Sequence, residues 1–229
     1  MKKFWNFEKL DDRRVLRLEG VIDNDNFWGD EITPEMFRKD LEADEGDLIV
    51  WINSPGGNVF AAAEIYTMLK EYSGTVTARI ASIAASAASV VAMAGDVIQM
   101  SPTALLMIHD PMTMAMGNTR DMEKAIATLN EVKESIINAY AAKTGLRRKK
   151  ISELMENETW MNAKKALELG FCDEVMYDEH ENEETVEACV FSTKIMNAAI
   201  MNKLQEKEPP VDDGSVPYET LMAKLIALK

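Results

Sequence analysis

The stretch DLIVWINSPGGNVFAAAEIYTMLK, residues 47–70, decides the fold class. It begins with an unbroken apolar run at residues 48–52, which is typical of a buried β-strand. Gly56 and Gly57 stop this strand, and the apolar residues that follow recur at the spacing of a helix. Either the glycines only form a tight turn, or the bare backbone N–H groups after the strand are positioned for a ligand to reach.

Strand and helix patterns alternate along much of the chain. This repetition predicts right-handed crossovers and an α/β fold with a largely parallel sheet. We expect strands at residues 14–22, 47–53, 75–82, 97–100, 104–108 and 171–177, and helices at residues 33–43, 61–72, 84–95, 119–143, 149–157 and 163–170.

The chain divides into two parts by composition. Residues 1–177 carry the strand and helix patterns and are expected to form one domain. Residues 178–229 hold an acidic run, a Pro- and Gly-containing linker and a C-terminal amphipathic helix.

Composition excludes several classes of function. The 229 residues carry a net charge of -14, which argues against a nucleic-acid partner because phosphate binding needs clustered Lys and Arg. The longest candidate for a membrane segment, residues 83–95, is too short to cross a bilayer, and the N-terminus lacks the apolar region of a secretory signal. We therefore expect a cytoplasmic protein. Cys172 and Cys189 have no metal-binding spacing, so no metal and no cofactor are expected.

Few residues can carry acid–base or nucleophilic chemistry. There are only two histidines, and His180 lies in the acidic run, whereas His109 ends an apolar strand, a rigid place for a base. A lone histidine at a strand end is more often structural than catalytic. Ser82, Ser86 and Ser89 lie where a strand meets a helix of small residues, and a helix N-terminus would stabilise an oxyanion. The spacing alone does not choose among these serines.

Four motifs occur in a fixed order, namely INSPGG (52–57), AASAAS (84–89), MIHDP (107–111) and ETWMNAKKALELGFCDEV (158–175). Together they resemble the proteolytic subunit of the Clp protease family, in particular its phage and prophage head-maturation branch. The similarity covers residues 14–177. It implies repeated ββα units as in Clp and crotonase-like proteins, with a protruding handle helix at residues 119–143.

The resemblance also implies a serine endopeptidase with a catalytic triad. The family's motifs match Ser86 as the nucleophile and His109 as the general base. Glu158 stands where the family has an aspartate, and a glutamate can orient an imidazole in the same way. Glu156 is the nearest rival for this role. Asp110 is poorly placed to hold the ring, because neighbours on a strand point to opposite faces.

The oxyanion hole and the assembly are likewise implied by the resemblance. The matching backbone N–H groups are those of Gly57 and Ala87. The family forms homo-oligomeric rings, typically heptameric and often double, that enclose a chamber for peptide or unfolded-protein substrates. Its partners are ATP-driven AAA+ unfoldases or, in the phage branch, capsid proteins.

Two alternatives to a Clp-type peptidase remain open at this point. A crotonase-like acyl-CoA enzyme shares the architecture and also uses two backbone N–H groups as an oxyanion hole. Such an enzyme would use carboxylates for catalysis in place of a Ser and His pair, and it would need basic residues to bind the CoA phosphates. A catalytically inactive ring-forming homologue would fit the glutamate at position 158.

Overall fold

The computed structural model describes residues 3–10, 13–22 and 34–177. The acidic run with His180, the linker and the C-terminal helix expected in residues 178–229 lie outside the described residues.

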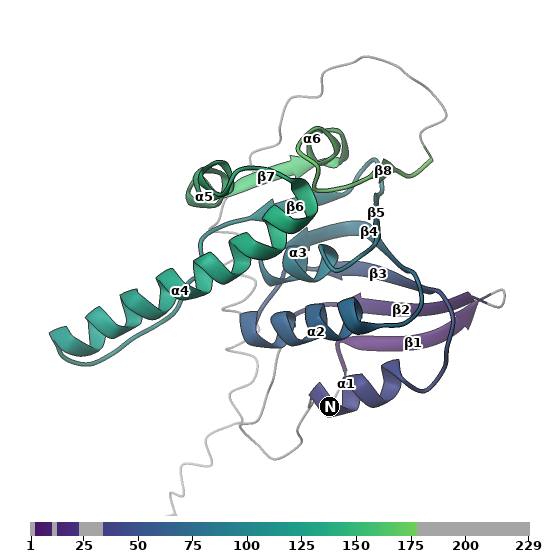
Figure 1. Ribbon diagram of the computed structural model, residues 1–229, viewed down its shortest axis with the longest axis horizontal. Helices are drawn as coiled ribbons and strands as arrows, with labels where there is room; N and C mark the ends of the chain where they lie inside the picture. Colours follow the sequence, from purple (N-terminus) through teal and green to yellow (C-terminus); the bar gives the residue numbers. More distant parts are fainter. Residues whose placement is uncertain (1–2, 11–12, 23–33, 178–229) are drawn as a thin grey trace, which may run out of the picture. The chain divides into compact units, whose positions relative to one another are not determined.

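A mixed sheet of eight strands forms the framework (Figure 1). The strands are β1 (Trp5–Leu10), β2 (Arg13–Glu19), β3 (Leu48–Ser54), β4 (Val76–Ala85), β5 (Val97–Met100), β6 (Leu105–Ile108), β7 (Thr159–Asn162) and β8 (Glu174–Val175). The main path of the sheet is β1-β2-β3-β4-β5-β8, and β6 pairs with both β4 and β7. Only β1 with β2 and β6 with β7 are antiparallel, so the prediction of a largely parallel α/β fold is confirmed.

Six helices connect these strands within the described residues. They are α1 (Pro34–Leu41), α2 (Val59–Glu71), α3 (Ala87–Ala92), α4 (Thr119–Thr144), α5 (Arg148–Glu156) and α6 (Ala163–Glu168). In Figure 1, α1, α2 and α3 lie on the same side of the sheet. Their apolar faces and the strands' alternate residues make one hydrophobic core. Among the described residues, no helix combines the length and the apolar character that crossing a bilayer requires.

Capping side chains set the ends of two predicted helices. Helix α2 begins two residues earlier than expected, because the Asn58 side chain accepts hydrogen bonds from the N–H groups of Phe60 and Ala61. Helix α4 begins after Asn118 in a capping box and ends at Gly145, whose φ of 69° is left-handed, as expected.

The predicted boundary between β4 and α3 was wrong. The helix was expected from residue 84, but β4 continues through Ala85, where it pairs with β6. Ladder hydrogen bonds to β6 therefore override the helical tendency of the small residues. As a result, Ser86 stands alone between the strand and the helix.

The sequence did not predict β1 and β7, and only Glu174–Val175 of the expected closing strand is a strand. Strand β1 has the charged residues Glu8 and Lys9 side by side, which breaks the alternation of a strand, and β7 has only four residues between two helices. Both are antiparallel additions to an otherwise parallel sheet. Such short segments have little periodicity to detect.

Helix α4 extends well away from the strands, with its N-terminal end most distant (Figure 1). Its buried residues, Ile136, Ile137, Ala139 and Tyr140, all belong to its C-terminal part. Further toward its start the apolar Ile126 is 60% exposed. The expected protruding helix is therefore present, and Ile126 is the residue of its apolar stripe that is exposed within the described part of the chain.

Candidate active site

Ser86 occupies a strained turn between β4 and α3. Its φ of 53° and ψ of -126° lie outside the regions that L-residues favour. The turn is held from both sides, because Ser86 N–H donates to the Met107 carbonyl at 2.9 Å and Ser89 N–H donates to the Ser86 carbonyl at 3.0 Å. This backbone directs the Ser86 side chain toward the end of β6.

His109 lies directly beyond β6 and meets this serine. Its Nε2 is 2.7 Å from Ser86 Oγ. In the tautomer with the proton on Nδ1, the serine hydroxyl donates to Nε2. Both side chains are half-buried, so they remain open to a substrate.

The structure separates the three candidate serines. Ser82 is exposed on β4, and Ser89 is fully buried. Among the described residues, Ser86 is the one of the three serines that contacts the His109 ring. The spacing of the three serines left this choice open. Because β4 extends to Ala85, Ser86 is the serine in the turn that faces His109.

Glu158 directly precedes β7, the strand that pairs with β6. The antiparallel register pairs Met107 with Trp160 and Ile108 with Thr159, so His109 and Glu158 are each one residue beyond the paired segment. Glu158 has a positive φ of 45°, and its Oε1 accepts a hydrogen bond of 3.2 Å from Trp160 Nε1. The carboxylate is therefore close enough to influence the imidazole electrostatically.

Burial lowers the pKa of His109 below its ordinary value of 6.5. The negative charge of Glu158, and then that of Asp110, raises this pKa, but by less than burial lowers it. The imidazole is consequently neutral at neutral pH, which is the form that can accept a proton.

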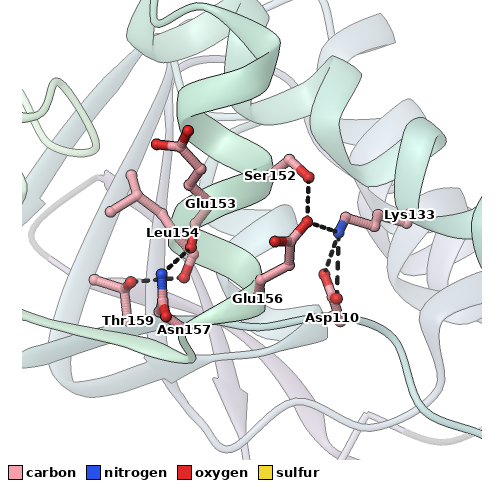
Figure 2. A network of polar contacts seen from close by, with 8 residues as sticks. All are labelled: Asp110, Lys133, Ser152, Glu153, Leu154, Glu156, Asn157 and Thr159. Carbon is pink, nitrogen blue, oxygen red and sulfur yellow. Dashed lines mark hydrogen bonds and ion pairs between the residues drawn. The ribbon is translucent and has the colours of Figure 1, made fainter.

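The rival carboxylates are engaged elsewhere. Asp110 and Glu156 both contact Lys133 of α4, as Figure 2 shows. The hydrogen bonds from Lys133 and then Ser152, with the charge of Lys133, lower the pKa of Glu156. Among the three carboxylates, Glu158 has the largest charge effect on His109, ahead of Asp110.

Gly56 and Gly57 meet different neighbours. A Cβ on the buried Gly56 would lie 2.6 Å from the Ala85 carbonyl and 2.8 Å from Ser86 Cβ, so the glycine turn packs directly against the serine turn. A Cβ on the exposed Gly57 would lie 2.1 Å from the Ile22 carbonyl. Glycine at 57 is thus required by the protein's own backbone, whereas the sequence suggested that it leaves room for a substrate.

The N–H groups of Gly57 and Ala87 have no hydrogen-bond acceptor within the described part of the chain. Ala87 is the first residue of α3, where helical N–H groups have no partner inside the helix. Its nitrogen would lie 2.9 Å from a Cβ on Gly56. The two turns therefore bring donors of the kind that an oxyanion needs to the same end of the sheet.

A buried contact that sequence reasoning missed supports the serine turn. Tyr140 of α4 lies 2.7 Å from Ser89 Oγ, which donates a hydrogen bond of 2.5 Å to the Ser86 carbonyl. Because Ser89 has one hydroxyl proton, the Tyr140 hydroxyl is the donor between these two side chains. Burial raises the pKa of Tyr140 well above its ordinary value. The helical spacing of Tyr140 identified it only as a core residue.

An apolar cavity of about 240 Å³ adjoins both motifs. It lies between the start of α2, the segment after His109, and α4. Its lining includes Val59, Phe60, Pro111, Met112, Leu129 and Val132. Val59 and Phe60 come two and three residues after Gly57, and Pro111 and Met112 come two and three residues after His109. The cavity is therefore next to the candidate site.

Comparisons with known proteins identify the family of the chain. The chain is 28% identical over 180 residues to the ATP-dependent Clp protease proteolytic subunit 1 of Protochlamydia amoebophila, covering 77% of this chain and 86% of that protein. It is 30% identical to the ATP-dependent Clp protease proteolytic subunit of Bacteroides fragilis, covering 74% of this chain and 82% of that protein. It is also 30% identical to the subunit of the same name from Streptococcus mutans, covering 74% of this chain and 88% of that protein. The sequence profile described as Clp protease matches residues 2–179. Because this match covers most of the chain's length, the chain belongs to the Clp protease family.

Proposed function

We propose that this protein is a serine endopeptidase. The single observation that carries the proposal is the 2.7 Å contact between Ser86 Oγ and His109 Nε2 at a strained turn. Membership of the Clp protease family and the names of the curated relatives support a peptidase.

Ser86 acts as the nucleophile and His109 as the general base. A serine hydroxyl is a weak nucleophile at neutral pH, so it needs a base to accept its proton as it attacks a peptide carbonyl. His109 is neutral under these conditions, because burial lowers its pKa below the ordinary value. It then returns the proton to the leaving amine, and water hydrolyses the acyl-enzyme.

Glu158 orients the imidazole and stabilises the imidazolium. The register across β6 and β7, and the upward effect of its charge on the His109 pKa, support this role. The Trp160 indole N–H donates to the carboxylate and restrains it. Glutamate stands here in place of the family's aspartate and can orient an imidazole in the same way.

The N–H groups of Gly57 and Ala87 bind the tetrahedral oxyanion. Each such donor contributes about 3 kcal/mol to transition-state stabilisation in other hydrolases. The apolar cavity beside these residues binds an apolar side chain of the peptide substrate.

The active enzyme is a homo-oligomer, in the form of a heptameric ring or a double ring enclosing the sites. Exposed apolar residues on α4 and on the segment before it support such contacts, among them Met114 at 92% and Met116 at 98% exposure. The relatives' name, ATP-dependent Clp protease proteolytic subunit, supports delivery of unfolded substrates by an ATP-driven unfoldase. Capsid proteins are the alternative substrates if the chain acts in phage head maturation.

Hydrolysis of a fluorogenic peptide tests the proposed function. Ser86→Ala should lower kcat by about 10⁴-fold or more while the fold is retained, because the nucleophile is removed. Ser82→Ala, at the exposed candidate serine on β4, is the matched control and should remain active. Equal activity of wild type and Ser86→Ala would refute the assignment.

A further inference from the structure

A network of charged side chains lies beside the candidate site and has no part in the chemistry above (Figure 2). Lys133 of α4 donates hydrogen bonds to Glu156 Oε1 at 2.8 Å and to Asp110 Oδ2 at 3.2 Å. Its Nζ also lies 3.0 Å from Asp110 Oδ1. Ser152 Oγ donates to the same oxygen of Glu156 at 2.8 Å. One ammonium group therefore joins α4, the segment after β6 and the last residue of α5.

The two carboxylates flank the proposed catalytic pair along the chain. Asp110 directly follows His109, and Glu156 precedes Glu158 by two residues. The paired part of β6 and β7 ends one residue before His109 and Glu158. The separation of these two side chains consequently depends on contacts beyond the ladder, and Lys133 makes such a contact between the two segments.

The charge states favour a fixed bridge. The Lys133 side chain is only 17% exposed. Burial lowers the pKa of Lys133, but its hydrogen bonds to Glu156 and Asp110 raise it by more, so the group remains charged. A largely buried ammonium is costly unless it is paired and hydrogen-bonded, and the two carboxylates meet this need in one arrangement.

We propose that Lys133 is a positioning residue for peptide hydrolysis, because its bridge between Asp110 and Glu156 fixes the separation of His109 from Glu158. This inference rests on the proposed function of that pair. The bridge has a second effect on the base. Asp110 raises the pKa of His109, and without the ammonium its charge would be uncompensated.

Helix α4 supplies a matched control. Its Lys143 side chain is 15% exposed and forms an ion pair of 2.9 Å with Asp173. It also donates to the carbonyl oxygens of Gly95 and Asp96. Lys143 resembles Lys133 in burial and pairing, but its partners Gly95, Asp96 and Asp173 do not belong to the candidate site.

Steady-state kinetics on a fluorogenic peptide test the proposal. Lys133→Met should lower kcat by about 10-fold or more and change KM by less than about 3-fold, since small displacements of catalytic groups are costly. The acidic limb of kcat/KM should move to higher pH, because uncompensated Asp110 raises the pKa of His109. Lys133→Arg keeps the charge and should restore most of kcat. Lys143→Met should change neither kcat nor the acidic limb.

Equal kcat and an equal acidic limb in Lys133→Met and Lys143→Met would overturn the inference. If circular dichroism shows that Lys133→Met is unfolded, Glu156→Gln replaces it, because this change removes one anion of the bridge at nearly constant volume. A several-fold lower kcat is then expected, and an unchanged kcat overturns the inference. A wild-type protein that neither hydrolyses the peptide nor reacts with a fluorophosphonate overturns the proposed function as well. If the wild type is active, and Lys133→Met and Lys143→Met have the same kcat and the same acidic limb, only the role of Lys133 is overturned.

Discussion

At the scale of single residues, Ser86 combines a reactive position with a strained backbone. A non-glycine residue with φ of 53° and ψ of -126° costs about 1–3 kcal/mol and persists only where neighbours enforce it. Here Met107 and Ser89 enforce it through backbone hydrogen bonds, and Tyr140 supports Ser89 from α4. The strain presents the hydroxyl to His109 rather than to the strand.

The acid limb of activity reports on His109 and Glu158. Because burial lowers the pKa of His109, kcat/KM should fall only below the ordinary histidine pKa of 6.5 as the pH decreases. Glu158→Gln removes a negative charge that raises this pKa, so the limb should move to still lower pH. The same variant should lower kcat by roughly 10³-fold or more, because the imidazole loses its orienting group.

Glu156→Gln is the comparison that identifies the third member of the triad. Glu156 bonds to Lys133 and Ser152, so its loss should lower kcat only several-fold. Measuring kcat and its pH profile for Glu156→Gln and Glu158→Gln shows which carboxylate orients His109. If Glu156→Gln is the more damaging change, the assignment of Glu158 is wrong.

At the scale of elements, the site depends on two turns packed against each other. The glycine turn between β3 and α2 lies against the serine turn between β4 and α3, and Gly56 is the point of contact. Both turns follow the carboxyl ends of neighbouring parallel strands.

Gly56→Ala should therefore be damaging for two reasons. The new Cβ would meet the Ala85 carbonyl at 2.6 Å, and a φ of 96° is unfavourable for alanine. Gly46→Ala is a matched control, since Gly46 has a φ of 106° but open space around its Cβ position. Thermal unfolding should show Gly56→Ala to be less stable than Gly46→Ala by about 1–3 kcal/mol, which is the usual cost of overpacking. Equal stability would show that the two turns are not in firm contact.

The elements that the sequence predicted correctly are those with strong local signals. The apolar run before Gly56 predicted β3, and the stripe that ends at Gly145 predicted α4. The β4–α3 boundary was missed because pairing with β6, a tertiary effect, extends the strand to Ala85. The resemblance to the Clp family, rather than periodicity, selected Ser86, His109 and Glu158, and their catalytic roles remain predictions.

Other site features have no signal in the sequence. Lys133 lies on a helix face that local composition predicts to be solvated, and only the fold brings Asp110 and Glu156 to it. Likewise, the neighbour that excludes a side chain at Gly57 is the Ile22 carbonyl, which comes from a different strand connection.

At the scale of the whole molecule, exposed apolar residues lie on α4 and on the segment before it. Ile126 is 60% exposed, and Met112 at 62% lies on the segment before the helix. Large apolar side chains that are exposed in one chain are commonly covered where proteins associate. A second copy of the chain is the partner that the proposed ring requires.

Native mass spectrometry or sedimentation measures this assembly. We expect wild-type protein to form a homo-oligomer and Ile126→Lys to form a smaller species with unchanged circular dichroism, because a charge replaces an apolar contact. Ala127→Lys, at the adjacent exposed position, should affect assembly less. A monomeric wild type that hydrolyses peptides at full rate would contradict the ring.

Labelling with a fluorophosphonate, followed by peptide mapping, tests the central claim most directly, because the reagent requires an activated serine. The assembled wild-type protein should be labelled on Ser86 alone, Ser82→Ala should be labelled in the same way, and Ser86→Ala should not react. Labelling on another serine, or an assembled wild type that does not react at all, would contradict the assignment of Ser86 and His109 as the catalytic pair.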